Sequence, residues 1–591
     1  MLRGIFLGTL KQPDPSRGTT KMKLKFAFAS LLVLSACGTS QEALQALDLM
    51  QFRENATVPG FSYSKLSGSG NDVKLEGVSF LSSPFMAAMM GMAEDGAEAE
   101  DADTESVGPV LTMGSVVLNG LTMKDGKPVV RDFVFNGISP VGDMGGTTVT
   151  VGSIGIEGMD ETTGAFIAGA FTEAGPEEIP AFEAWKFGKA AISNIAVKGE
   201  VETEAGLSSF DVKVGELSVS NLNDTMMGLV RIAGIAGEVN IPTEMVPISA
   251  VFDLGKLDIA NLNSGLFVKP FMMGMEAAMT GSSEPDFASM YADYTSPLEA
   301  GYDRLDWSGM SVDVSGLKLN SSPLSSVLTR NADGVVTATE MPHASLKLTA
   351  DSSGGMAGAM GLMVLAMAGY PSDSVEIYAG GKATFDPEKD ITRYTGYNLG
   401  VTDVVDVKMD VGVVGLQAAL PALMSAVTSM TSLVGDAVEP ELDDEGNPVP
   451  GDSDDMSNAS TMMAMQMMMA VMPLQLTDLD MSITDETLVK LILNQQAAGA
   501  GQSLDDYRAD LVAMVQGASV FMSDAGVDPA IASELTTAAA GFLSGPGTLR
   551  LQIKPKQPFG VLSAMAAPIT KDSLGFSATF TPAAAPEPAT N

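Results

Sequence analysis

A nine-residue pattern that recurs in the first half of the chain limits the available folds more than any other feature. The pattern is apolar-Gly-x-apolar-x-apolar-x-(Gly or Asn)-apolar, and it occurs at residues 113–121, 151–159, 187–195, 214–222 and 254–262. Within each copy the apolar residues alternate with other residues, which is typical of a β-strand with one buried face. The closing glycine or asparagine suits a turn or a bulge.

The copies recur without a strict period, because their leading glycines lie 38, 36, 27 and 40 residues apart. Stacked β units with variable spacing favour a large antiparallel sheet over a regular solenoid. We therefore predict a β-rich α+β fold made of repeated antiparallel β units with Met-rich helices, followed by a C-terminal unit of a strand, helices and a strand.

Segments rich in methionine and small apolar residues are interleaved with these strands. They lie at residues 85–92, 271–279, 356–370, 411–434 and 462–472, with flanking charges and Gly or Pro breaks that indicate short helices. Methionine is flexible and polarizable and adapts to irregular apolar partners. The simpler interpretation is that these helices fill the core beneath the sheet. The alternative is that they line an apolar cavity for a lipid.

The C-terminal part has the clearest local signals. We expect a strand, then a helix capped by Thr484, two helices that begin behind Ser503 and behind Asp528-Pro529, and a final strand with one solvent-facing side. This order resembles the C-terminal segment of uncharacterised exported proteins of alphaproteobacteria over residues 474–565, and the resemblance brings no known activity. The apolar residues that mark the two strands are Leu479, Met481, Ile483, Leu549, Leu551 and Ile553.

The N-terminal region has the features of an export signal. The basic residues of 22–25 precede an apolar run at 26–34, which is shorter than the roughly 20 residues that span a bilayer. We expect Met22 to be the true start, because Pro and Asp residues interrupt the sequence before it.

The four residues Leu34-Ser35-Ala36-Cys37 resemble the lipobox of bacterial lipoproteins. That resemblance implies cleavage before Cys37, a thioether-linked diacylglycerol on its sulfur and an additional N-acyl chain, and two or more chains give stable anchoring. The following Gly38 implies sorting to the outer membrane, with the protein facing the periplasm. A buried structural cysteine is the alternative for Cys37.

The charge of the chain argues against several kinds of partner. The whole chain has 33 basic and 73 acidic residues, and removal of residues 1–36 takes away six and one of them, which leaves a formal net charge of −45. Such a chain repels nucleic acid and anionic headgroups. With Cys37 as its one cysteine, the chain cannot form an internal disulfide, so its fold must rest on its core.

Two acidic stretches, 94–105 and 439–455, have the composition of disordered segments. Together with the patterns above, they give a division into six parts. These are an N-terminal extension with the signal peptide (1–36), a lipidated segment with an acidic linker (37–105), a repeat-containing β-rich region (106–435), an acidic linker (436–460), a C-terminal α+β unit (461–580) and a tail (581–591).

The sequence offers little material for catalysis. His343 is the single histidine, and a lone histidine beside a strand is more often structural or exposed than catalytic. Neither a Gly-x-Ser-x-Gly elbow nor a P-loop is present, and we expect neither a zinc or copper site nor a cofactor. A glycosidase-like pair of carboxylates, one acting as acid and one as base, stays open. However, the chain has only two tryptophans, and sugar-binding sites usually use aromatic side chains as platforms. Residues 443–447 could bind calcium, although a solvated turn is the simpler interpretation.

These features lead to two hypotheses for a protein that we expect not to be an enzyme. In the first, an envelope lipoprotein binds or carries a hydrophobic ligand such as a lipid. In the second, a structural or assembly lipoprotein offers its sheet as a surface for envelope proteins and binds no small molecule.

Overall fold

The computed structural model describes two compact units that are rich in β-strands. The chain divides into Met1–Leu262 (unit 1) and Asn263–Asn591 (unit 2), so the predicted region 106–435 contributes strands to both. The residues described are 38–82, 108–141, 146–176, 180, 184–203, 206–243, 247–263, 296–367, 369–370, 372–420, 471–560, 563 and 568–583.

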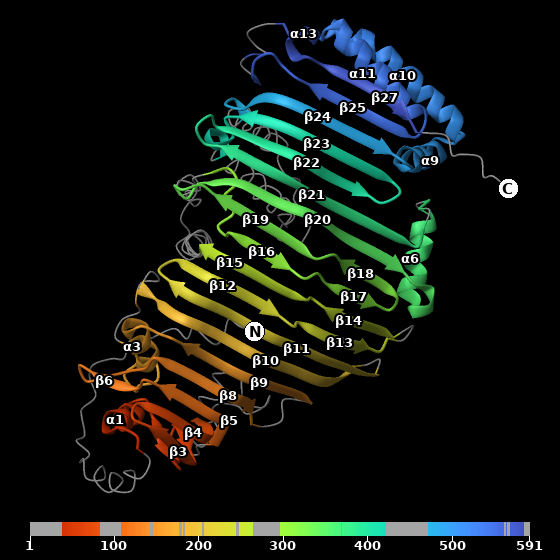
Figure 1. Cartoon of the computed structure of the whole chain (residues 1–591). Coiled ribbons are helices and arrows are strands. Elements are labelled where there is room, and N and C mark those ends of the chain that lie inside the picture. Colours follow the sequence, from red (N-terminus) through yellow and green to blue (C-terminus); the bar gives the residue numbers. More distant parts are fainter. Residues whose placement is uncertain are drawn as a thin grey trace, which may run out of the picture. The chain divides into compact units, whose positions relative to one another are not determined.

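Unit 1 is built on one sheet whose long strands are antiparallel and pair largely in chain order (Figure 1). From β4 the pairing runs through β5, β8, β9, β10 and β11 to β12 and β13, while β14 pairs with β13 and β15 with β12. The strands are β1 (Phe52–Glu54), β2 (Gly60–Tyr63), β3 (Lys65–Ser69), β4 (Asp72–Ser82), β5 (Gly108–Asn119), β6 (Thr122–Lys124), β7 (Lys127–Val129), β8 (Asp132–Pro140), β9 (Thr147–Glu157), β10 (Lys186–Thr203), β11 (Gly206–Asn223), β12 (Met226–Ala233), β13 (Ala236–Ile241), β14 (Ile248–Asp253) and β15 (Lys256–Asn263).

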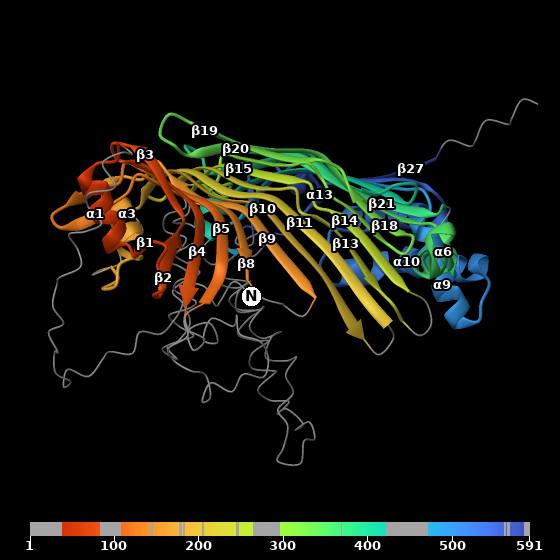
Figure 2. The same ribbon diagram turned by 90° about the horizontal axis from the view of Figure 1, so that it is seen from below.

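Two short helices pack on one end of this sheet. Helix α1 (Gln41–Leu49) begins at Ser40, whose side chain accepts a hydrogen bond from the Ala43 N–H, and α3 (Glu161–Gly169) begins at Asp160 in the same way. Figure 2 shows the two helices together at that end. They bury the main core of the unit against β4, β5 and β8.

The predicted repeat is confirmed as a β-strand, and its closing residue as a turn-like position. The five copies lie on β5, β9, β10, β11 and β15, and the closing residue of each has a left-handed backbone. Such a conformation favours glycine and, next, asparagine. The closing φ values are 65° at Gly120, 68° at Gly158, 53° at Asn194, 55° at Asn221 and 52° at Asn261.

Three more strands carry the same six-residue spacing, which shows that the repeating unit is a single strand. Their closing residues are Gly77 on β4 (φ 58°), Gly137 on β8 (φ 63°) and Gly234 between β12 and β13 (φ 65°). The corresponding leading residues are Asn71, Arg131 and Gly228. The spacing between copies varies because the connections between strands differ in length.

Unit 2 holds the remaining strands, which pair largely antiparallel, and most of the helices described. Its helices are α6 (Met356–Met367), α9 (Leu488–Ala500), α10 (Leu504–Asp524), α11 (Pro529–Ser544) and α13 (Lys571–Leu574). The strands are β16 (Arg304–Trp307), β17 (Ser311–Val314), β18 (Leu317–Ser321), β19 (Leu324–Arg330), β20 (Val336–Ala350), β21 (Ser374–Asp386), β22 (Ile391–Val401), β23 (Val405–Val414), β24 (Gln475–Asp485), β25 (Gly547–Ile553), β26 (Phe559–Gly560) and β27 (Ser577–Pro582).

The predicted C-terminal order of a strand, three helices and a strand is confirmed as β24, α9, α10, α11 and β25. Ser503 accepts the Asp506 N–H and Asp528 accepts the Ala530 N–H, as the capping signals predicted. The prediction that Thr484 caps the first helix is wrong. β24 continues to Asp485, whose buried carboxylate accepts the Val489 N–H in the first turn of α9.

Helix α6 is the Met-rich segment that the structure describes best, and it does not fill a core. Gly358 and Leu365 are its buried residues, while Met367 is 80% exposed. Gly361 lets the helix lie close to the sheet, because a Cβ there would lie 3.0 Å from Ala350 Cβ of β20 and from Leu317 Cδ1 of β18. The methionines of α6 therefore face outward.

Candidate ligand-binding face

The repeat places two rows of close backbone contacts across the unit 1 sheet. Because neighbouring strands are antiparallel, the leading residue of one copy faces the closing residue of the next, and each facing pair includes at least one glycine. The first glycine row is Gly77, Gly114, Gly137, Gly152, Asn194, Gly215 and Gly234, and the second is Asn71, Gly120, Arg131, Gly158, Gly188, Asn221 and Gly228.

Between the two glycine rows, each strand points two apolar side chains to the same face of the sheet. Directly opposed residues of antiparallel strands share a face, so these side chains form two continuous lines across seven strands. We call this strip the apolar lane. Its lines are Leu75, Val116, Phe135, Ile154, Ile192, Leu217 and Ile232, and Val73, Leu118, Phe133, Ile156, Ala190, Val219 and Val230.

The lane is sealed at one end and open further along. Leu75, Val116 and Leu118 are 0% exposed, because α1 and α3 pack over β4, β5 and β8. Ile154 on β9 is already 37% exposed, and the lane residues of β10, β11 and β12 are all partly exposed. The same repeat therefore makes the protein core at one end and an accessible apolar surface at the other.

Aromatic rings close the sealed end of the lane. Phe171, just after α3, has its ring centroid 4.7 Å from that of the lane residue Phe133, and Phe52 of β1 is stacked on Phe61 of β2 at 4.6 Å. Phe135 lies 4.7 Å from Phe133 in the same cluster. The cluster ends at β8, so the open lane is entirely aliphatic.

The opposite face of the same strands is charged and internally paired. Lys189 Nζ lies 2.8 Å from Glu216 Oε1, and Arg231 donates two hydrogen bonds to Asp258, which also pairs with Lys256 at 2.6 Å. The Lys189 ammonium lowers the pKa of Glu216, and the Arg231 guanidinium lowers the pKa of Asp258. Of the two faces of these strands, only the lane face offers a surface for an apolar ligand.

A hollow of about 750 Å³ lies beside α1, β7 and α3, with polar and apolar residues mixed around it. Its charged residues include Asp48, Arg53 and Glu161, and all three are in ion pairs: Arg53 lies 3.6 Å from Asp48, and Glu161 binds Lys124. In the described ranges, His, Cys, Asp and Glu side chains form no group of three that could hold a metal ion. We assign no chemistry to this hollow.

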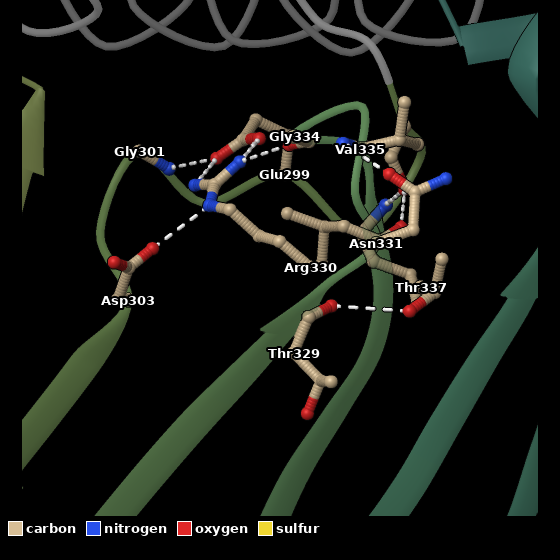
Figure 3. A network of polar contacts seen from close by, with 12 residues as sticks. Glu299, Gly301, Asp303, Thr329, Arg330, Asn331, Gly334, Val335 and Thr337 are labelled. Carbon is tan, nitrogen blue, oxygen red and sulfur yellow. Dashed lines mark hydrogen bonds and ion pairs between the residues drawn. The ribbon is translucent and has the colours of Figure 1, made fainter.

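Arg330 of unit 2 is a partly buried cation at the centre of a polar network (Figure 3). Its Nη1 and Nη2 lie 2.7 and 2.9 Å from the two Glu299 oxygens, Nε donates to Asp303 at 2.8 Å, and Nη1 also donates to the Gly334 carbonyl. These carboxylates raise the pKa of Arg330. Because its donors are occupied by the protein, Arg330 joins the 299–303 loop to β19 rather than binding a ligand.

His343 lies exposed at a bulge in β20, in line with its predicted role as a structural or exposed residue. Its ring centroid is 5.2 Å from that of Tyr378, and the Tyr378 hydroxyl donates to Asp406 Oδ1 at 3.0 Å. Burial and the neighbouring Asp406 raise the pKa of Tyr378 to about 12. These contacts hold the tyrosine protonated and provide no activated nucleophile.

Several predicted features lie outside the described residues. They are Cys37 with the signal segment, both acidic stretches, the calcium candidate at 443–447, the Met-rich segments 85–92 and 271–279, and most of those at 411–434 and 462–472. None of the helices in the described part of the chain has the length and apolar character needed to cross a bilayer.

Comparison with known proteins reaches only the C-terminal part of the chain. Residues 399–579 match a family model described as an uncharacterized protein, which includes the predicted strand, helices and strand at 474–565. No curated protein and no solved structure matches the chain. The matched family is one without an assigned activity, so the functional argument rests on the residues and the geometry above.

Proposed function

We propose that this protein is an outer-membrane lipoprotein, held by acyl chains on Cys37 and facing the periplasm, that binds the acyl chain of a lipid along the open part of its apolar lane. The observation that supports this proposal most is the continuity of the lane. It leaves the sealed core at β8 and continues over β9, β10, β11 and β12 with aliphatic side chains only. Monomeric proteins rarely expose long contiguous apolar strips that have no binding role.

The chemistry of the lane suits a flexible hydrocarbon better than an aromatic or charged ligand. Burial of each CH₂ group contributes about 0.8 kcal/mol, so a chain lying along several strands gains affinity without any hydrogen bond. The lane side chains of Ile154, Ile192 and Leu217 carry no polar atoms that would select a headgroup.

The proposed lipid anchor on Cys37 is tested by measuring the acyl groups attached to the protein. The full chain, expressed in a Gram-negative host, should incorporate radiolabelled palmitate and gain the mass of a diacylglycerol and an N-acyl group at Cys37. The variant Cys37→Ser should incorporate none. A mature protein without added mass contradicts the anchor and leaves the lane proposal standing.

The lane is tested by photocrosslinking from a matched pair of adjacent residues that point to opposite faces. A benzophenone side chain at Ile154 should crosslink a phospholipid that carries radiolabel in its acyl chains. The same side chain at Ser153, whose hydroxyl lies 2.6 Å from that of Ser193, should not. Equal labelling from both positions, or none from Ile154, overturns the proposal. Protein adducts at Ile154 in place of lipid would support the assembly role.

A further inference from the structure

The first residues after Cys37 are bound tightly to the fold. The Gly70 N–H donates to the Gly38 carbonyl at 2.7 Å, and the Ser40 N–H donates to the Gly70 carbonyl at 2.6 Å. Thr39 forms a parallel bridge with Gly70 between these two bonds. The Ser40 hydroxyl also donates to Asn71 Oδ1 at 2.5 Å.

The segment is fixed on its other side as well. Ser40 caps α1, and within that helix Ala43 and Ala46 are 0% exposed against the core. Pulling Gly38 away from Gly70 therefore requires breaking this bridge and loosening the cap of a buried helix. The backbone between Gly38 and the core of unit 1 is therefore held in place and cannot extend.

Cys37 is joined to Gly38 by a peptide bond. Consecutive Cα atoms are about 3.8 Å apart, so Cys37 lies one residue from a backbone bonded to the β3–β4 turn. We propose that the lipid anchor has no spacer and therefore presses the β3–β4 turn, residues 68–72, against the lipid headgroups. This inference rests on the acylation of Cys37 proposed above and names the surface that meets the membrane.

The contact would be imposed by the tether and not by charge. Lys65 and Lys74 on the hairpin both pair with Glu76, at 2.9 and 3.0 Å, and the turn itself is made of small polar residues with one acid, Asp72. A surface of this composition has little attraction for anionic lipids. Docking on neutral phosphatidylcholine is therefore expected.

The position of the turn also determines which end of the apolar lane lies near the membrane. Asn71, which receives the Ser40 hydroxyl, starts the second glycine row, and the next strand, β4, is the sealed end of the lane. The tethered end of unit 1 is thus its closed end, and the open lane begins at β9, about 14 Å along the sheet at a strand spacing near 4.8 Å.

The single native cysteine makes the test direct, because its sulfur is blocked once it carries diacylglycerol. Ser69→Cys in the exposed turn and Val251→Cys on β14, which is 52% exposed, each add one reactive thiol. β14 lies seven strand pairings from β4, roughly 34 Å away. Each lipidated variant is labelled with a fluorophore and placed in phosphatidylcholine vesicles that contain a headgroup quencher.

The label at position 69 should lose most of its fluorescence, and the label at 251 should keep most of it. A Gly/Ser insertion of roughly 20 residues between Cys37 and Gly38 adds a tether of about 25 Å and should restore the signal at position 69. Equal quenching at both positions, or no effect of the insertion, overturns the proposal. Failure of the unmodified protein to float with vesicles refutes the anchor instead, so the two failures are distinguishable.

Discussion

Gly152 of β9 lies directly opposite Asn194 of β10, and a Cβ added to Gly152 would come within 2.7 Å of the Asn194 Cβ. Asn194 has a φ of 53°, which turns its side chain toward the neighbouring strand. The glycine that opens one repeat is therefore required by the left-handed residue that closes the next one. This relation explains why the pattern contains two special positions six residues apart.

The first prediction concerns this pair. Gly152→Ala should lower the free energy of unfolding by about 2 kcal/mol, because the added methyl group forces two paired strands apart. Asn194→Gly should change stability by only a few tenths of a kcal/mol, since glycine also accepts a positive φ. In the double variant, the loss from Gly152→Ala should shrink, because the clashing Asn194 Cβ is gone.

Denaturant unfolding of the four proteins checks this coupling. Gly517→Ala is the matched control, because nothing lies within 4 Å of the Cβ that it adds in α10, and it should raise stability by up to about 1 kcal/mol. Additive effects of the two substitutions at 152 and 194 would contradict the proposed contact.

The same relation shows how much of the fold was predictable from the sequence. Alternation and the closing Gly or Asn identified strands on β5, β9, β10, β11 and β15. The copy on β8 has Arg131 in the leading position, where it faces Gly120 and Gly158. A pattern that requires a leading glycine misses this copy, because the physical requirement is one glycine in each facing pair.

The candidate site was harder to predict because sequence does not show which part of an apolar face is covered. Val116 and Leu217 occupy the same position of the repeat, yet α1 and α3 bury only the first. Thr484 shows a related limit at the local level. Threonine is a residue type that often caps helices. Here, however, pairing of β24 with β23 and β25 continues through Asp485, so the helix starts later in the chain.

The second prediction uses an ion pair between the C-terminal strands of unit 2. Arg550 donates two hydrogen bonds to Asp480, at 2.8 and 2.6 Å, and holds the pKa of Asp480 to about 2. A folded-state pKa below the usual aspartate value of 3.8 adds stability that is complete above about pH 4 and is lost as the pH falls through about 2. Because the Arg550 side chain is 52% exposed, we expect about 1 kcal/mol.

Asp480→Asn should therefore be less stable than the unmodified protein at pH 7, and the difference should shrink to a small fraction near pH 2, as measured by urea unfolding at a series of pH values. The exposed Asp333→Asn serves as the control for a general change in charge. A difference between Asp480→Asn and the unmodified protein that persists unchanged to pH 2 would show that the ionised carboxylate is not its source.

The third prediction concerns Arg330 and the nearly buried Glu299, whose side chain is 6% exposed. Arg330→Lys should cost about 3 kcal/mol, because lysine cannot make the paired bonds and leaves a buried carboxylate undersatisfied. Arg304→Lys is the matched control, since Arg304 pairs with Asp306 on the surface and is 57% exposed; it should cost less than about 1 kcal/mol. Thermal unfolding measures the stability lost in each variant. Equal losses would show that the Arg330–Glu299 pair contributes no more than a surface ion pair.

The last prediction separates core from ligand site within one strip of the sheet. Leu118 and Leu217 both lie in the apolar lane, and Leu118 is 0% exposed while Leu217 is partly exposed. Leu118→Ala should cost about 3 kcal/mol of unfolding free energy and leave lipid affinity of the folded protein unchanged, because its neighbours are the helices and rings of the core. Leu217→Ala should cost less stability and weaken lipid binding about tenfold, since lost CH₂ contacts are worth about 0.8 kcal/mol each. Calorimetric unfolding and titration with a phospholipid measure both quantities for both variants. If Leu217→Ala lost only stability, the open lane would be a second core surface and the lipid would bind elsewhere.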